Sequence, residues 1–207
     1  MNPYLLLLFV ALLFILGFGG LSWLRGEGLP GYFAWEALGF TAVVLLITWA
    51  TKVTMSPVLF LVLLYLFTMR ARLLIDLGNA FSTRGIHRQA LSLFHLALRL
   101  DHDAFSQAIG QINIGVLLIR QERFEEAIAL LSKVLIHMPR GRGGPKYEAA
   151  CRYNLGLAYL RSGQEAKAVE QFNEVIQLLP QSLYARSAEA ALKKRGKMRQ
   201  EGRAEHD

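Results

Sequence analysis

The sequence has very little cysteine, and its first third has very little charge. A single cysteine, Cys151, occurs in 207 residues, which excludes an internal disulfide framework and a cysteine-rich zinc site. Residues 1–69 carry only four charged side chains, whereas residues 70–207 carry 21 basic and 14 acidic ones, and the whole net charge of +7 lies there. Such a surplus suits an acidic partner or an anionic membrane surface, although a solvated surface with a basic tail would also produce it.

Signatures of catalysis and of cofactor binding are absent as well. None of the motifs HExxH, GxSxG and GxxxxGKS/T occurs, and the five histidines are scattered along the chain. Asp101, His102 and Asp103 could bind a metal, but they stand where a helix is expected to begin, so helix capping is the favoured interpretation. We expect no enzyme activity, no cofactor and no metal site. We interpret Cys151 as a small core residue and the basic, glycine-rich segment 140–146 as a loop.

Three apolar runs occupy the first third of the chain. The first, residues 3–24, has no charge and is long enough to cross a bilayer as a helix. A signal peptide is the alternative, but the run lacks a basic start and another apolar run follows it, so we expect a retained anchor. The second run covers residues 32–50 and carries one charge, Glu36, for which the helix start and the lipid headgroups are suitable surroundings.

The third run, residues 53–69, is short for a span, and a re-entrant or interfacial helix is its alternative. Three spans would place Arg25, Arg70 and Arg72 on one side and Lys52 on the other. The bias of basic residues toward the cytoplasm then predicts a multi-pass protein of the plasma or inner membrane with residues 70–207 in the cytoplasm. Two spans would put both termini on the same side.

The charged part of the chain contains an internal repeat. The segments LGNAF (77–81), IGVLL (114–118) and LGLAY (155–159) align with one another. Each is followed nine residues later by an alanine and four residues further on by a large apolar residue: Ala90 with Phe94, Ala127 with Leu131, and Ala168 with Phe172. Prolines close the second and third units at Pro139 and Pro180, and His102 stands at that place in the first.

This pattern resembles the tetratricopeptide repeat, whose signature is L-G-x2-Y, A-x3-F and a closing proline. The resemblance covers about residues 71–182. It implies an all-α fold in which pairs of helices stack into a solenoid, with small residues allowing close approach and large residues filling the space between units. The segment after Pro180 then becomes a capping helix. Its basic end, residues 193–199, is either a solvated tail or a contact for anionic lipid, and no aromatic interleaving supports nucleic-acid binding.

A protein-binding groove is what the resemblance implies about function. Some members of the family use asparagines on the first helix of successive repeats to hold the backbone of a peptide, and Asn113 and Asn154 resemble that arrangement. The basic residues that bind the C-terminal carboxylate in chaperone receptors are missing here. The expected groove residues are Asn79, Ile112, Asn113, Val116, Arg120, Tyr153, Asn154, Leu157 and Arg161.

The expected architecture is therefore an apolar anchor (1–69), three repeats (70–182) and a capping helix with a basic tail (183–207). Pro57 suits the first turn of a helix, and only Gly78 interrupts the sequence from there to Thr83. We therefore expect one unbroken helix from the third apolar run into the first repeat. The expected function is a membrane-anchored scaffold or adaptor that binds a protein partner; a structural subunit of a larger membrane complex is the alternative.

The topology can be tested with single cysteines introduced at positions 28, 54 and 205. If three spans place residues 70–207 in the cytoplasm, an impermeant thiol reagent added to intact cells labels position 54 and leaves positions 28 and 205 unlabelled. Labelling of position 205 from outside would contradict the orientation, and protection of position 54 would contradict three spans.

Overall fold

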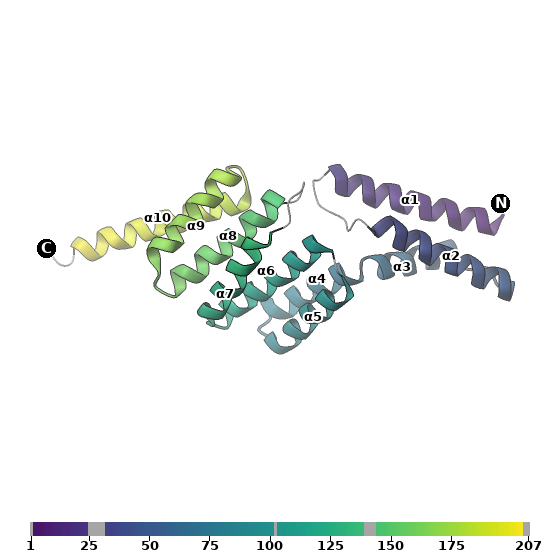
Figure 1. Ribbon diagram of the computed structural model, residues 1–207, viewed down its shortest axis with the longest axis horizontal. Coiled ribbons are helices and arrows are strands. Elements are labelled where there is room, and N and C mark those ends of the chain that lie inside the picture. The colour runs from purple at the N-terminus through teal and green to yellow at the C-terminus, as the bar shows by residue number, and fades with distance from the viewer. Residues whose placement is uncertain (1, 25–31, 102, 139–143, 205–207) are drawn as a thin grey trace.

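A computed structural model describes residues 2–24, 32–101, 103–138 and 144–204 of the chain. The described residues form ten helices and no strand, arranged as an elongated molecule with a group of apolar helices at one end and stacked helix pairs at the other (Figure 1). The helices are α1 (Pro3–Leu24), α2 (Phe33–Thr51), α3 (Pro57–Thr68), α4 (Arg70–Thr83), α5 (His87–Leu100), α6 (Ala104–Arg120), α7 (Phe124–Ile136), α8 (Gly144–Arg161), α9 (Glu165–Leu178) and α10 (Leu183–Ala204). The all-α fold expected from the sequence is confirmed.

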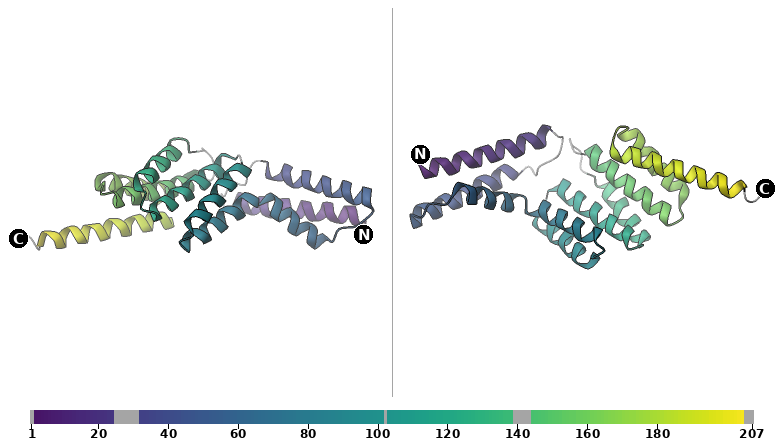
Figure 2. Two further views of the ribbon diagram at one scale, coloured as in Figure 1. Left: turned by 90° about the horizontal axis from the view of Figure 1, so that it is seen from below. Right: turned by 180° about the vertical axis from the view of Figure 1, so that it is seen from behind.

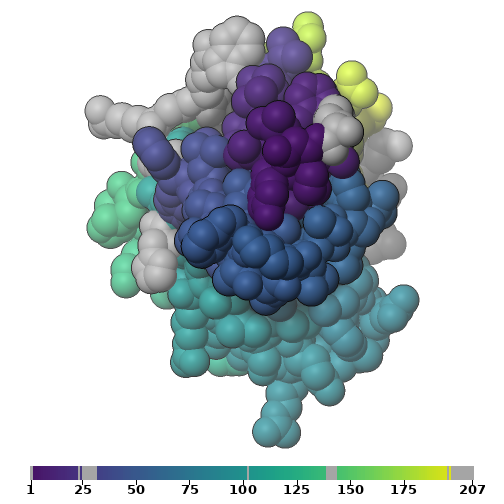
Figure 3. Space-filling model, turned by 90° about the vertical axis from the view of Figure 1, so that its right-hand side faces the viewer, coloured from purple at the N-terminus to yellow at the C-terminus, as the bar shows by residue number. Residues whose placement is uncertain are grey.

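Helices α1, α2 and α3 pack against one another through one buried stripe each. Leu7, Ala11 and Phe14 of α1 meet Ala37 of α2 and Phe60 of α3 in a common apolar cluster. Their outer faces are also apolar and remain exposed; Trp35, for example, is 75% exposed. Among the described residues, α1 and α2 are long and apolar enough to cross a membrane. Seen from the apolar end of the molecule, these helices lie in front of the first repeat (Figure 3).

The third apolar run forms a shorter helix than the sequence suggests. Helix α2 ends at Thr51, the next residue, Lys52, adopts a left-handed conformation with φ 58°, and α3 begins only at Pro57. Proline is favoured in the first turn of a helix because the amide hydrogen that it lacks would have no partner there. The 12 residues of α3 extend roughly 18 Å, which is less than the hydrocarbon thickness of a bilayer.

The unbroken helix expected from Pro57 to Thr83 is not found, and that expectation is wrong. Helices α3 and α4 meet at Met69 with a bend of 73°. A side chain enters the backbone ladder at this point, because Arg70 Nη1 donates to the carbonyl of Phe67 (2.7 Å). Side-chain insertion into the hydrogen-bond ladder is an established cause of sharp kinks, so neither proline nor glycine is needed here.

The remaining helices form the stacked pairs α4–α5, α6–α7 and α8–α9, followed by α10, which packs against α8 and α9 (Figure 2). Close approach within each pair is centred on a glycine. A Cβ added at Gly78 would lie 2.5 Å from the ring of Phe94, and one at Gly156 would lie 2.7 Å from the ring of Phe172. Gly115 is crowded by Leu131 in the same way, at 2.6 Å. The small and large residues that recur in the sequence are therefore the residues that contact each other within each helix pair.

The turns inside the three pairs share one backbone conformation. The residues at the turn are Gly85 (φ 77°), Glu122 (φ 60°) and Gly163 (φ 81°), each in the left-handed region. Two of the three turns use glycine, for which this region is free of steric cost, and the middle turn holds a glutamate there. The repeats therefore coincide in their turns as well as in their cores.

Helix α10 extends from the repeats in the direction opposite to α1–α3, so that the two chain ends lie at opposite ends of the molecule (Figures 1 and 2). Lys193 and Lys194 are exposed on it. Because the basic end points away from the apolar helices, this arrangement does not support contact between the tail and a bilayer that holds α1 and α2.

Replacement of Gly78 by alanine tests the close contact between this glycine and Phe94. The added methyl group would overlap with the Phe94 ring, so we expect a loss of about 1–3 kcal/mol in the free energy of unfolding, measured by chemical denaturation. Gly196→Ala is the matched control, because no atom lies within 4 Å of the place that an added Cβ would occupy and alanine favours the helix. Equal stability of Gly78→Ala and the unchanged protein would contradict the close approach.

A second test concerns Cys151, which is fully buried between the second and third pairs and donates to the carbonyl of Leu131 (3.3 Å). Burial raises the pKa of its thiol to about 12. The folded protein should therefore react with a thiol reagent at pH 8 only after denaturant is added.

The same shift makes stability depend on pH. An unfolded cysteine has a pKa of about 8.5, so as pH rises from there the unfolded state ionises first and is favoured. The stabilisation is complete below about pH 8.5 and is lost as pH rises toward the folded pKa of about 12. Compared with Cys151→Ala, the unchanged protein should lose more free energy of unfolding between pH 8.5 and 11. In the labelling experiment, rapid reaction of the folded protein with the thiol reagent at pH 8 would contradict the burial of Cys151.

Candidate functional site

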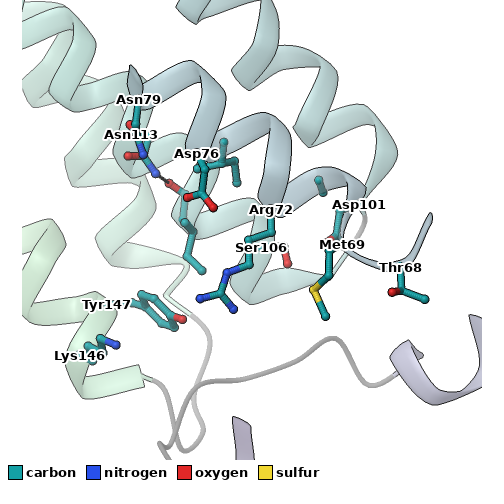
Figure 4. Close-up of a pocket in the computed structure, with 13 residues that line it drawn as sticks. Thr68, Met69, Arg72, Asp76, Asn79, Asp101, Ser106, Asn113, Lys146 and Tyr147 are labelled. Carbon is teal, nitrogen blue, oxygen red and sulfur yellow. Dashed lines mark hydrogen bonds between the residues drawn. The ribbon is translucent and has the colours of Figure 1, made fainter. Parts of the chain in front are cut away.

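A hollow of about 250 Å³ lies where the first helices of the three pairs, α4, α6 and α8, face one another. Its lining comes from four places along the chain: the end of α3, one face of α4, the turn between α5 and α6 with the first part of α6, and the start of α8 (Figure 4). The lining residues are Thr68, Met69, Ala71, Arg72, Ile75, Asp76, Asn79, Asp101, Ser106, Ile109, Asn113, Lys146 and Tyr147. The hollow therefore adjoins the apolar helices.

Asn79 and Asn113 are the two expected groove residues that the structure brings together in this hollow (Figure 4). Asn113 Nδ2 donates to the carbonyl of Ile109, one turn earlier in the same helix, at 2.8 Å. This bond fixes the amide and leaves its oxygen and its second hydrogen for another partner. An amide held in this way can both accept from and donate to a peptide backbone.

Asn154 has the same local geometry in a different place. Its Nδ2 donates to the carbonyl of Ala150 at 2.8 Å, which reproduces the bond of Asn113 one repeat later. It does not line the hollow. The two asparagines are therefore equivalent in conformation and differ in surroundings.

The two arginines of the expected groove lie outside the hollow. Arg120 Nη1 donates to the hydroxyl of Ser82 at 3.0 Å and so connects α6 to the buried end of α4. Arg161 is exposed at the end of α8. The predicted role of these arginines in binding a carboxylate therefore has no support from their positions.

Three of the four apolar residues of the expected groove, Ile112, Tyr153 and Leu157, take part in packing instead. Ile112 is only 6% exposed and belongs to the core between the second and third pairs. The ring of Tyr153 lies 5.9 Å from the rings of Phe172 and Tyr184, and Leu157 packs in the same cluster. Val116 is half-buried and is not part of the lining.

Sequence reasoning missed most of the lining, although a signal was present. Seven residues before Asp76, Asn113 and Asn154 stand Met69, Ser106 and Tyr147 respectively, and all three line the hollow. Residues seven apart lie on one face of a helix. Arg120 and Arg161 of the expected groove stand seven residues after Asn113 and Asn154, on the same face of their helices. The hollow lies one such period toward the start of each helix, whereas the expected groove extended toward the end of each helix.

Charges of both signs line the hollow. Arg72 and Lys146 are basic, and Asp76 and Asp101 are acidic. Asp101 already accepts hydrogen bonds from the hydroxyl of Tyr32 and from the backbone amide of Asp103. Together with amide and apolar side chains, this mixture suits a stretch of polypeptide.

Metal binding finds no support in the part of the chain that the structure describes, where no group of three or more His, Cys, Asp or Glu side chains could hold an ion. Asp103 instead caps α6, because its carboxylate accepts from the amides of Phe105 and Ser106, both at 3.1 Å. The capping interpretation of Asp103 is therefore confirmed; His102 lies outside the described residues.

Comparison with known proteins agrees with this geometry. A model of the tetratricopeptide repeat family matches residues 106–181, which correspond to the pairs α6–α7 and α8–α9. No curated protein matches the chain. The pair α4–α5 lies outside the match but has the same glycine–phenylalanine contact and the same turn as α8–α9. The chain therefore contains tetratricopeptide repeats over residues 106–181.

Proposed function

We propose that this protein is a membrane-anchored scaffold that binds a segment of a protein partner in the hollow next to the bilayer, in the assembly or organisation of a membrane complex. Repeats of this family are protein-interaction modules. The observation that carries the proposal is the position of the hollow, whose lining includes Thr68 and Met69 at the end of the apolar helices. Residues 1–69 serve as the anchor, 70–182 as the repeats and 183–207 as the cap and tail.

The arrangement of the apolar helices supports three crossings. Helix α1 runs toward the repeats and α2 runs away from them, so the chain must return across the bilayer to reach α4 (Figure 1). Helix α3 supplies roughly 18 Å of this return. Residues 52–56 are non-helical and, apart from Met55, exposed, and they would lie at the far headgroups, where their backbone groups can reach water.

With three crossings, the excess of basic residues at the cytoplasmic ends of membrane spans favours a cytoplasmic location of the repeats. Arg70 and Arg72 stand at the end of the return crossing, on the side of the repeats, and Lys52 stands at the opposite end. The cytoplasmic side of spans is the richer in Lys and Arg. A partner bound in the hollow would then lie close to the inner membrane surface.

A structural subunit of a larger membrane complex is the second candidate. Gly17, Gly19, Gly20 and Gly39 have open space where a Cβ would be. Small residues of this kind let another helix approach closely within a bilayer. Helices α1 and α2 would then be the main contact with the partner, and the hollow would contribute less.

A photo-reactive amino acid at Ser106 tests the binding site in native membranes. If the hollow is occupied, illumination should join the protein to a discrete partner, whereas the same group at the exposed Glu126 on α7 should not form that adduct. Adducts formed only from the lipid-facing side of α1 or α2 would favour the structural subunit over the scaffold.

The captured segment then allows a quantitative test of the amide side chains. Asn113→Ala should weaken its binding by about 1–3 kcal/mol, measured by titration calorimetry on the full chain, because a buried hydrogen bond is lost. Asn154→Ala is a closely matched control, since Asn154 makes the same local bond outside the hollow. Equal effects of the two substitutions would reject the hollow as the site.

A further inference from the structure

Polar contacts join the start of α2 to the bend between α3 and α4. The guanidinium of Arg70 binds both carboxylate oxygens of Glu36, with Nη2 at 2.6 Å from Oε1 and Nη1 at 3.1 Å from Oε2. The same guanidinium donates to the carbonyls of Phe67 (2.7 Å) and Leu100 (3.3 Å). One side chain therefore connects three helices: α2, the end of α3 and the end of α5.

A second set of contacts starts one turn earlier in the chain. The hydroxyl of Tyr32 donates to the carboxylate of Asp101 and accepts from the backbone amide of Asp103 at 3.3 Å. Asp101 lines the hollow, and Asp103 caps α6 through the amides of Phe105 and Ser106. Tyr32 thus reaches the rim of the hollow directly.

These contacts lie at the point where the repeats could rotate relative to the apolar helices. A single residue, Met69, separates α3 from α4, so without further contacts the repeats could swing about one point. The side chains of Arg70 and Glu36 are only 28% and 22% exposed, and a bidentate pair of this kind is stronger than one in open water. Arg70 also donates to the carbonyl of Phe67 at the bend.

We propose that Tyr32, Glu36 and Arg70 are positioning residues that lock the first repeat to the apolar helices and thereby hold the hollow at a set angle to them. The lock goes beyond the proposed function, since it requires no partner and can be tested in detergent or lipid nanodiscs with the purified full chain. It predicts that the molecule behaves as one rigid body, and that loss of the lock frees the repeats to swing without unfolding them.

Distances between spin labels at positions 49 and 174 measure this rigidity. Both side chains are exposed, one at the far end of α2 and one on α9, and Cys151→Ala removes the native thiol. We expect a narrow distance distribution in the otherwise unchanged protein and a distribution at least twice as wide in Glu36→Ala and Arg70→Ala. The double variant should be no wider than Arg70→Ala alone, because the two residues act through one contact. Arg70→Lys, which keeps the charge and loses the bidentate geometry, should be intermediate.

Two controls separate a released lock from a damaged fold. Labels at the exposed positions 133 and 174 report on the repeats alone and should give the same distribution in every variant. Glu126→Gln removes an ion pair of the same kind, between Arg123 and Glu126 at 2.6 Å, on the exposed surface of α7 and should leave both distributions unchanged.

Tyr32→Phe provides a milder variant that removes one oxygen. Loss of the hydroxyl that binds Asp101 and is one of two acceptors for the amide of Asp103 should speed amide hydrogen exchange several-fold at the start of α6, while exchange in α8 stays constant. Distributions for positions 49 and 174 that stay as narrow in Glu36→Ala, Arg70→Ala and Tyr32→Phe as in the unchanged protein would overturn the proposal. A change that appears equally in the pair 133 and 174 would overturn it too, since the residues would then support the fold in general.

Discussion

The contact of a glycine in one helix with a large side chain in the next is the constraint on which the repeats depend. At Gly78, Gly115 and Gly156 the backbone of the first helix lies directly against Phe94, Leu131 or Phe172 of the second. Any side chain at these glycines would push the pair apart. Because each pair exposes an apolar face that only its neighbour can cover, the correct spacing in one pair is a condition for the stacking of all of them. The face that carries the hollow follows from that stacking.

The apolar helices add a second constraint, which is the direction of the repeats. The stacking by itself leaves open how the solenoid is joined to α1–α3. In the structure the two groups of helices are joined by the bend at Met69 and by the contacts of Arg70 with Glu36 and Leu100. At this junction the start of α6 and one face of α4 lie beside the end of α3, and the hollow forms between these three helices. In the proposed function, this geometry would present a partner's segment close to the membrane surface.

The candidate site illustrates how far a periodic pattern can be followed. Two of the expected groove residues, Asn79 and Asn113, line the hollow, whereas Asn154, Arg120 and Arg161 lie outside it. The position of the site along the helices could not be read from the seven-residue spacing, because this spacing is the same at the start and at the end of a helix. Ile112, Tyr153 and Leu157 lie on neighbouring positions, and whether such residues face a groove or a core depends on the helix packed against them.

Local periodicity in the sequence by itself determined the helical class, the three helix pairs and the apolar character of the first third. These features depend on contacts between residues that are close in the chain or that repeat at a set distance, so a single sequence contains their pattern. Only the tertiary structure decided the bend at Met69, the role of Glu36 and the location of the hollow. Glu36 and Arg70 are 34 residues apart, and Tyr32 and Asp101 are 69 residues apart. No spacing rule links such residues, because they meet only when the apolar helices and the first repeat have folded against each other.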